Sequence, residues 1–162
     1  MVRIQKLHHA AYRCKDSELT RSFYEDFLGL KLVKTLIIKK TITKRKCDVL
    51  HTFYQLEDGS HIAFFEEPLS NFDFKEQHDF DLHIAFEVTL QVLDFMYDKG
   101  KKIGIDTRGI IDHGFIKSIY FRDPNGYVIE LTVNNKDNFF SEDINARNDL
   151  AKWQNNKPKA VY

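Results

Sequence analysis

The chain has 162 residues, which suits one compact domain or two small modules that share a core. Lys and Arg together number 24, as do Asp and Glu, so no bulk charge attracts nucleic acid or an anionic membrane. No apolar run approaches the ~20 residues that span a bilayer, and the N-terminus lacks the apolar core of a signal peptide. We therefore expect a cytoplasmic protein. Cys14 and Cys47 match no metal or redox motif, which favours free thiols.

The first part of the chain predicts one strand, one helix and three further strands, in that order. The expected elements are a strand over 3–14, a helix over about 16–28, and strands over 30–38, 49–56 and 60–67. Near-helical spacing predicts that Leu19, Phe23 and Phe27 form the buried stripe of this helix, and Gly29 is well placed to end it. The basic residues 39–46 are interpreted as a solvated turn.

The second part of the chain repeats this order after a polar linker. The expected elements are the linker over 68–79, a strand over 81–88, a helix over 90–100, a short strand over 103–108, a hairpin over 117–133, and a tail over 135–162 with a short helix near 141–153. Val92, Leu93 and Met96 form the apolar stripe of the second helix, and Gly100 is its expected stop.

The last hairpin turns at residues 123–126, Asp-Pro-Asn-Gly. Proline presets φ for the first turn position, and glycine supplies the positive φ that closes a three-residue loop. If Asp123 pairs with Tyr127, Tyr120 lies directly opposite Glu130 and shares its face of the sheet. Glu130 is the only acid in an otherwise apolar strand. It marks either an exposed strand face or a carboxylate aimed into a cavity.

An internal repeat relates the two parts of the chain. The stretch HAAYRC at His9 answers HIAFEV at His83. The hairpin strand that holds Ala63 answers the strand that holds Glu130 when the turn glycines are aligned. A single βαβββ module leaves one face of its sheet uncovered, so we expect two modules to lie side by side and curl their sheets into a cleft.

The predicted fold class is therefore α+β, with two tandem βαβββ modules forming a curved mixed sheet around a metal-binding cleft. The first module spans residues 1–67 and the second spans residues 80–134, joined by the linker 68–79 and followed by the tail 135–162. The two modules together form one domain.

Three side chains at repeat-equivalent places suggest a metal site. His9 and His83 occupy the same point on the first strand of each module, and Glu130 lies on the last strand of the second module. Two imidazoles and one carboxylate form the facial triad that suits non-haem Fe(II), Mn(II) or a similar divalent ion, with open positions for substrate, water or oxygen. Each residue alone fits a structural role, but their coincidence in the repeat favours ligands.

Other side chains lie near these three by strand alternation or along the chain. The candidate substrate-pocket residues are Arg13, His51, Phe53, Phe65 and Ser118, and the candidate catalytic residues are Tyr120 and His113. The near-neutral pKa of histidine suits His113 to acid–base work. Arg13 is either a clamp for a substrate anion or a paired structural charge. The aromatic residues form either a wall for a planar substrate or ordinary core.

Three stretches of the chain, HHAAYRCKDSELTRSFYEDFLGLKLV, LHIAFEV and SIYFRDPNGYVIEL, resemble the vicinal oxygen chelate superfamily over about residues 5–134. This group includes glyoxalase I, extradiol dioxygenases, and fosfomycin- and bleomycin-resistance proteins. The resemblance implies that His9, His83 and Glu130 bind the metal. It selects His9 over His8 because the metal-binding histidine of the family precedes the first helical Asp, here Asp16, by seven residues.

Several positions differ from the patterns of individual family members, and these differences indicate which activities of the family the chain resembles. Ala63 stands where glyoxalase I and the epimerases place a fourth ligand, so the site resembles the three-ligand sites of extradiol dioxygenases and fosfomycin-resistance enzymes. Tyr120 matches the active-site tyrosine of ring-cleaving extradiol enzymes, whereas Ile111 replaces a further histidine of those enzymes. The pattern of basic and Ser residues that is specific to fosfomycin resistance is absent, although Lys117 and Ser118 suit a smaller anion.

The favoured interpretation is a metal-dependent, dioxygenase-like enzyme acting on a small vicinal-oxygen substrate such as a catechol or hydroquinone, with Fe(II) as the favoured metal. One alternative is a glyoxalase-like lyase or thiol transferase with Mn, Ni or Zn. A second alternative is a non-catalytic drug-binding protein of the bleomycin-resistance type. The resemblance also implies a homodimer and leaves open whether the modules pair within one chain or between two. Neither nucleic acid nor membrane is an expected partner.

Overall fold

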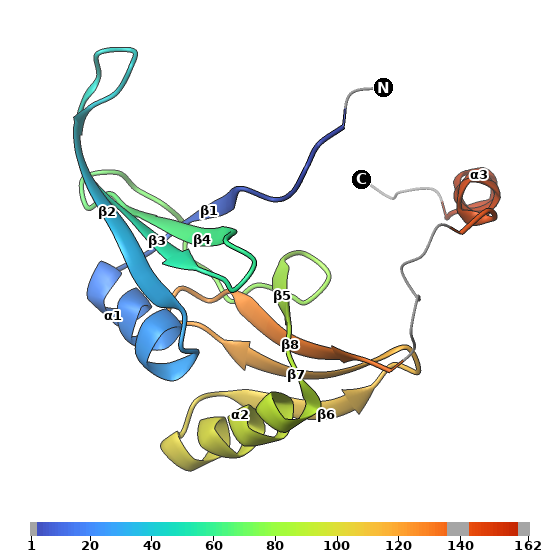
Figure 1. Cartoon of the computed structure of the whole chain (residues 1–162). Helices are drawn as coiled ribbons and strands as arrows, with labels where there is room; N and C mark the ends of the chain where they lie inside the picture. The colour runs from blue at the N-terminus through green and yellow to red at the C-terminus, as the bar shows by residue number, and fades with distance from the viewer. Residues whose placement is uncertain (1–2, 136–142, 159–162) are drawn as a thin grey trace.

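The structure is a computed structural model that describes residues 3–135 and 143–158. The first module contains β1 (His9–Arg13), α1 (Ser17–Arg21), the π-helix η1 (Ser22–Phe27), β2 (Lys31–Lys40), β3 (Lys46–Gln55) and β4 (His61–Glu66). The second contains β5 (His83–Glu87), α2 (Leu90–Ile103), β6 (Thr107–Asp112), β7 (Ile116–Arg122) and β8 (Val128–Asn134), and α3 (Ala146–Asn156) follows. The tandem βαβββ order is confirmed (Figure 1).

Each module builds its own four-stranded mixed sheet. The strand orders are β1-β4-β3-β2 and β5-β8-β7-β6. In each sheet the first strand runs parallel to the last strand of its module, and the other neighbours are antiparallel. The repeat alignment is confirmed at the ladders, because Phe53 lies opposite Ala63 as Tyr120 lies opposite Glu130. The first strands, β1 and β5, are therefore edge strands.

The first helix begins as predicted and buries Phe23 and Phe27 of its predicted stripe, but not Leu19. The Asp16 side chain caps it by accepting a hydrogen bond of 2.7 Å from the Leu19 backbone N–H. The Leu19 side chain is 59% exposed, so its place in the buried stripe was wrong. Thr20 and Tyr24 join Phe23 and Phe27 as the inward positions. Their i, i+3, i+4, i+7 spacing centres the buried face on Thr20 and Tyr24 and turns Leu19 toward solvent.

The second helix runs one turn past its predicted stop. It ends at Ile103, and Gly104, with φ of 78°, is its left-handed C-cap. Gly100 lies inside the helix and is buried. A Cβ at this position would collide with the Thr107 hydroxyl and the Phe121 ring. The glycine at 100 therefore serves close packing rather than termination. Val92, expected in the apolar stripe, is exposed, whereas the other two stripe residues are buried.

The basic stretch 39–46 contains the predicted turn, but it is strand at both ends. β2 continues to Lys40 and β3 begins at Lys46, so that only 41–45 form the tip of a long hairpin, which projects from the body of the molecule (Figure 1). The C-terminal helix α3 lies later than the predicted 141–153, of which residues 141–142 fall outside the described residues. No helix among the described residues is long and apolar enough to cross a membrane.

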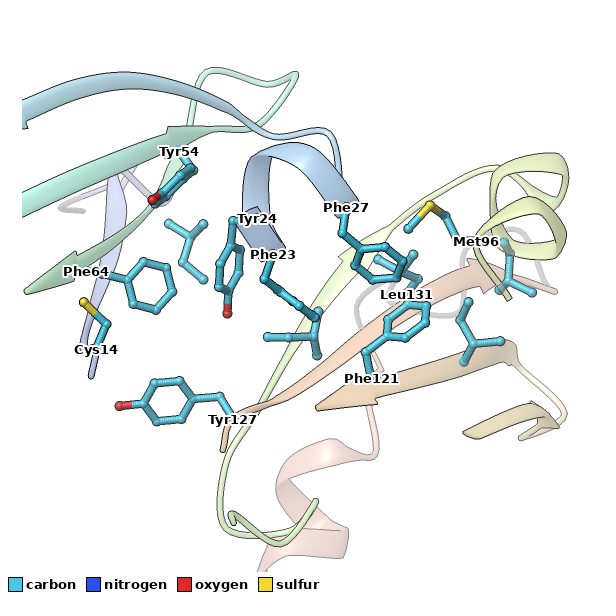
Figure 2. Close-up of a cluster of buried hydrophobic side chains, with 14 residues drawn as sticks. Cys14, Phe23, Tyr24, Phe27, Tyr54, Phe64, Met96, Phe121, Tyr127 and Leu131 are labelled. Carbon is cyan, nitrogen blue, oxygen red and sulfur yellow. The ribbon is translucent and has the colours of Figure 1, made fainter. Parts of the chain in front are cut away.

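The modules share one aromatic core. Side chains of the first helix contact both sheets and so connect the two halves of this core. The Phe27 ring contacts the Phe121 ring edge to face, with centroids 5.0 Å apart, and Tyr24 packs on Phe64 at 4.7 Å (Figure 2). The Tyr24 hydroxyl also donates a 3.0 Å hydrogen bond to the Asp123 carboxylate in the last turn. The turn between β7 and β8 is thereby docked against the first module.

Candidate metal centre and its surroundings

The last hairpin places Glu130 as its turn chemistry predicts. The Asp123 N–H donates to the Tyr127 carbonyl at 3.0 Å, and Gly126 has φ of 96°. The register puts Tyr120 opposite Glu130, and the Tyr120 hydroxyl donates to Glu130 Oε1 at 3.1 Å. Glu130 is only 5% exposed. The interpretation of Glu130 as an exposed strand face is therefore excluded.

His83 meets the other oxygen of the same carboxylate. Its Nε2 lies 3.4 Å from Glu130 Oε2, because β5 pairs with β8. Its Nδ1 lies 2.7 Å from the Asp79 backbone carbonyl, which can only accept, so Nδ1 carries a proton. When the ring is neutral, Nε2 is then a lone pair that faces a carboxylate oxygen. Two facing acceptors need a cation or a proton between them, and this donor set fits a divalent metal ion.

Tyr120 connects this carboxylate to His113. Because its hydroxyl proton goes to Glu130, the Tyr120 oxygen accepts from His113 Nε2 at 2.9 Å. Burial, together with the Glu130 charge, raises the pKa of Tyr120. The phenol therefore stays protonated at neutral pH. The two candidate catalytic residues therefore lie together beside Glu130.

Arg108 and Asp79 belong to the same cluster, and the sequence did not single them out. Arg108 lies on β6 opposite Tyr120, with its guanidinium carbon 5.5 Å from the centre of that ring. Its Nη2 and Nη1 donate to Asp79 Oδ1 and Oδ2 at 2.9 and 3.3 Å. Arg108 could have been found from its pairing with Tyr120 across the β6–β7 ladder. A bulge between Gly109 and Ile111 sets that pairing, and the bulge is not evident from the sequence.

His9 lies on β1 among the rings of the first module. Its Nδ1 is 2.8 Å from His8 Nδ1, and its ring centroid is 5.8 Å from that of Phe53. His51 stacks on Phe65 with centroids 3.7 Å apart. The registers of β1, β3 and β4 put these side chains on one face of the sheet. The structure thus brings together the aromatic candidates of the first module.

The three candidate ligands do not converge within one chain. Among residues 3–135 and 143–158, no group of three or more His, Cys, Asp or Glu side chains is arranged to hold a metal ion. His83 and Glu130 form a pair in the second module, whereas His9 stays with the first. Each histidine sits on an edge strand of a different sheet.

Two further pocket candidates make hydrogen bonds within their own module or the linker that follows it. Ser118 is fully buried and donates to the Thr132 hydroxyl at 3.1 Å. Arg13 donates to Glu67 Oε2 at 2.8 Å and also to the backbone carbonyls of Glu67 and Ser70, which matches a paired structural charge. The Glu67 side chain is 11% exposed and also pairs with Arg45.

Comparison with known proteins shows one family. The model of the Glyoxalase/Bleomycin resistance protein/Dioxygenase superfamily matches residues 6–131. No curated protein matches the chain.

Solved structures share its fold at low identity. A glyoxalase/dioxygenase from Nostoc punctiforme is 24% identical, with a TM-score of 0.62 over 82% of this chain and 92% of that one. A mutant of the fosfomycin resistance protein FosX from Listeria monocytogenes, complexed with Mn(II) and 1S,2S-dihydroxypropylphosphonic acid, is 21% identical, with a TM-score of 0.60 over 80% and 92%. A glyoxylase/bleomycin resistance protein/dioxygenase domain from Frankia sp. EAN1pec is 17% identical, with a TM-score of 0.66 over 82% and 100%.

Proposed function

Because the chain belongs to the Glyoxalase/Bleomycin resistance protein/Dioxygenase superfamily, we propose that it is a metal-dependent enzyme whose ligands are His9, His83 and Glu130. The observation that carries this proposal is the pairing of His83 Nε2 with the buried Glu130 carboxylate at 3.4 Å. Two imidazoles and a carboxylate suit Fe(II), which we favour, as well as Mn, Ni and Zn. Ala63, fully buried at the repeat-equivalent position, offers no fourth ligand.

We propose that a second copy of the chain completes the site. His9 and His83 lie on β1 and β5, the edge strands of two separate sheets. Edge strands present unpaired backbone groups, so β1 of one copy can pair with β5 of another. A twofold axis would make this contact twice and give two equivalent sites. Each site would combine His83 and Glu130 of one chain with His9 of the partner subunit.

The favoured reaction is a dioxygenase-type reaction on a small catechol or hydroquinone. When bound, a divalent ion supplies Lewis acidity to the vicinal oxygens of the substrate. Tyr120 holds its proton beside Glu130 and can donate a hydrogen bond to a substrate oxygen. His113, whose Nε2–H donates to the phenol oxygen, keeps the proton of Tyr120 directed away from His113. Phe53, Phe65 and His51 supply an aromatic wall for a planar ring.

The second candidate is a glyoxalase-like lyase or a thiol transferase with Mn, Ni or Zn. The His113–Tyr120 pair favours it equally, because proton transfer needs no oxygen. Oxygen uptake across catechols, hydroquinones and thiol adducts separates the two. Turnover in the absence of oxygen would exclude the dioxygenase assignment and support the lyase or transferase. A non-catalytic drug-binding protein would contain no metal and would show no activity when metal is added.

The test of the metal site is Glu130→Ala. Removing the one carboxylate of the triad should abolish metal binding and activity, measured by elemental analysis of protein purified without chelators. Glu57→Ala is the matched control, because Glu57 is exposed in the turn between β3 and β4 and lies on neither edge strand of the proposed contact. Glu57→Ala should keep the metal. Unchanged metal content in Glu130→Ala would overturn the assignment.

A further inference from the structure

The backbone carbonyl of Asp79 sets which nitrogen of His83 is free. It accepts from His83 Nδ1 at 2.7 Å, and a carbonyl has no proton to offer in return. The hydrogen bond therefore keeps the proton on Nδ1 and directs the Nε2 lone pair toward Glu130. A histidine whose Nδ1–H is fixed in this way is prepared to bind a metal through Nε2. The position of residue 79 thus decides whether His83 is ready to bind.

The side chain of Asp79 is fixed by a two-pronged ion pair. Both of its carboxylate oxygens accept from Arg108, at 2.9 and 3.3 Å. The hydrogen bonds from Arg108 lower the pKa of Asp79, so the pair stays charged. A planar guanidinium that binds both oxygens restrains orientation as well as distance. Asp79 belongs to residues 67–82, a segment without helix or strand, so this restraint comes from outside its own segment.

Arg108 also touches the other half of the site. It lies on β6 directly opposite Tyr120, and its guanidinium covers that ring at 5.5 Å. The same group therefore contacts the residue that orients His83 and the residue that bonds Glu130. The Arg108 and Asp79 side chains are 45% and 33% exposed, and ion pairs so exposed contribute little to stability. The contacts of Arg108 with Asp79 and with Tyr120 therefore serve to position these two residues.

We propose that Arg108 and Asp79 form a brace that holds His83 in its Nδ1–H tautomer and keeps Tyr120 against Glu130. Neither residue is a metal ligand or touches the reacting atoms, so both are positioning residues. The brace rests on the proposed metal site for its purpose, but its effect on His83 exists in the metal-free protein. The two proposals can therefore fail separately.

The test compares Arg108→Gln and Asp79→Asn with the wild type in metal-free full-length protein. Nitrogen-15 NMR of the imidazoles, at about pH 8 where free histidine is neutral, reports the tautomer of His83. The wild type should keep a proton on Nδ1, with or without a second proton on Nε2 against Glu130, and both variants should shift toward a ring protonated at Nε2 alone. Arg21→Gln is the matched control, since Arg21 also binds several carboxylate oxygens but lies in the first module. It should leave His83 unchanged.

Metal affinity is the second measurement. Titration with Mn(II) should show binding weakened about 10- to 100-fold in Arg108→Gln and Asp79→Asn, with unchanged stoichiometry. Arg108→Lys keeps the charge but loses the planar fork, so it should fold and still bind more weakly than the wild type. An unchanged His83 tautomer in both brace variants would overturn the proposal. If the tautomer shifts while the wild type binds no metal, the brace stands and the proposed function fails.

Discussion

His51 combines deep burial with one fixed hydrogen bond. It is 6% exposed, stacks on Phe65 and donates from Nδ1 to the Phe64 carbonyl at 2.9 Å. Burial lowers the pKa of His51 below its ordinary value of 6.5, and the nearby His9 adds to this effect. The folded protein therefore holds this ring neutral at a pH where the unfolded chain would protonate it.

The sign of the pH dependence follows from proton binding. Below about pH 6.5 the unfolded chain binds a proton at His51 that the folded protein excludes, so unfolding becomes more favourable as pH falls. The contribution is fully present above pH 6.5 and is lost as pH falls toward the lowered pKa. Urea unfolding of the wild type should show this loss of stability between pH 7.5 and 5.5, and His51→Phe should reduce it. An equal loss in His51→Phe would assign it to other groups.

Residues of the site differ in how far the sequence could reveal them. The Tyr120–Glu130 pair follows from turn chemistry because the hairpin is local in sequence. Arg108 depends on the bulge in β6, and Asp79 depends on the path of an irregular segment, and neither leaves a periodic signal. The separation of His9 from the other two candidate ligands depends on how two sheets associate, which local patterns do not encode.

At the scale of elements, α2 shows why a glycine can be misread. Glycine near the end of an apolar stripe predicts a stop, but Gly100 instead allows the helix to approach β6 and β7 closely. The same chain contains a true stop four residues later, at Gly104. Burial separates the two, and burial is a property of the tertiary structure.

Gly100→Ala tests this role. Alanine favours the helix by about 1 kcal/mol, but its methyl group would press on Thr107 and Phe121, at a cost of about 1–3 kcal/mol. We expect a net loss of about 1 kcal/mol in the free energy of unfolding, measured by urea denaturation. The adjacent, exposed Lys101→Ala should change the free energy by less than about 0.5 kcal/mol. A more stable Gly100→Ala would show that the space is not filled.

At the scale of the molecule, the fold itself was predictable, because the order of elements repeats and each module keeps the same ladder. The shared core was not, since the contact of Phe27 with Phe121 joins the first helix to the sheet of the other module. We propose that a second chain completes the metal site. This proposal can be tested by mixing two variants that each lack a different candidate ligand.

Complementation distinguishes a site between chains from a site within one. When purified separately, His9→Ala and Glu130→Ala should each contain no bound metal. Mixed during refolding, they should form dimers in which one of the two sites is whole, giving about a quarter of the wild-type metal content if pairing is random. Elemental analysis of the mixture measures this. No recovery, despite dimers in sedimentation, would contradict a site shared between subunits.

The remaining sheet edges bear on the size of any assembly. β2 is the outer edge of its sheet and carries Lys31, Lys34, Lys39 and Lys40 beside Ile37, which is 70% exposed. β6, the other outer edge, is interrupted by its bulge. Lysines and bulges hinder edge-to-edge pairing, and β1 and β5 have neither. If two copies join through β1 and β5, the guarded outer edges close the complex at two chains and prevent its growth into a filament.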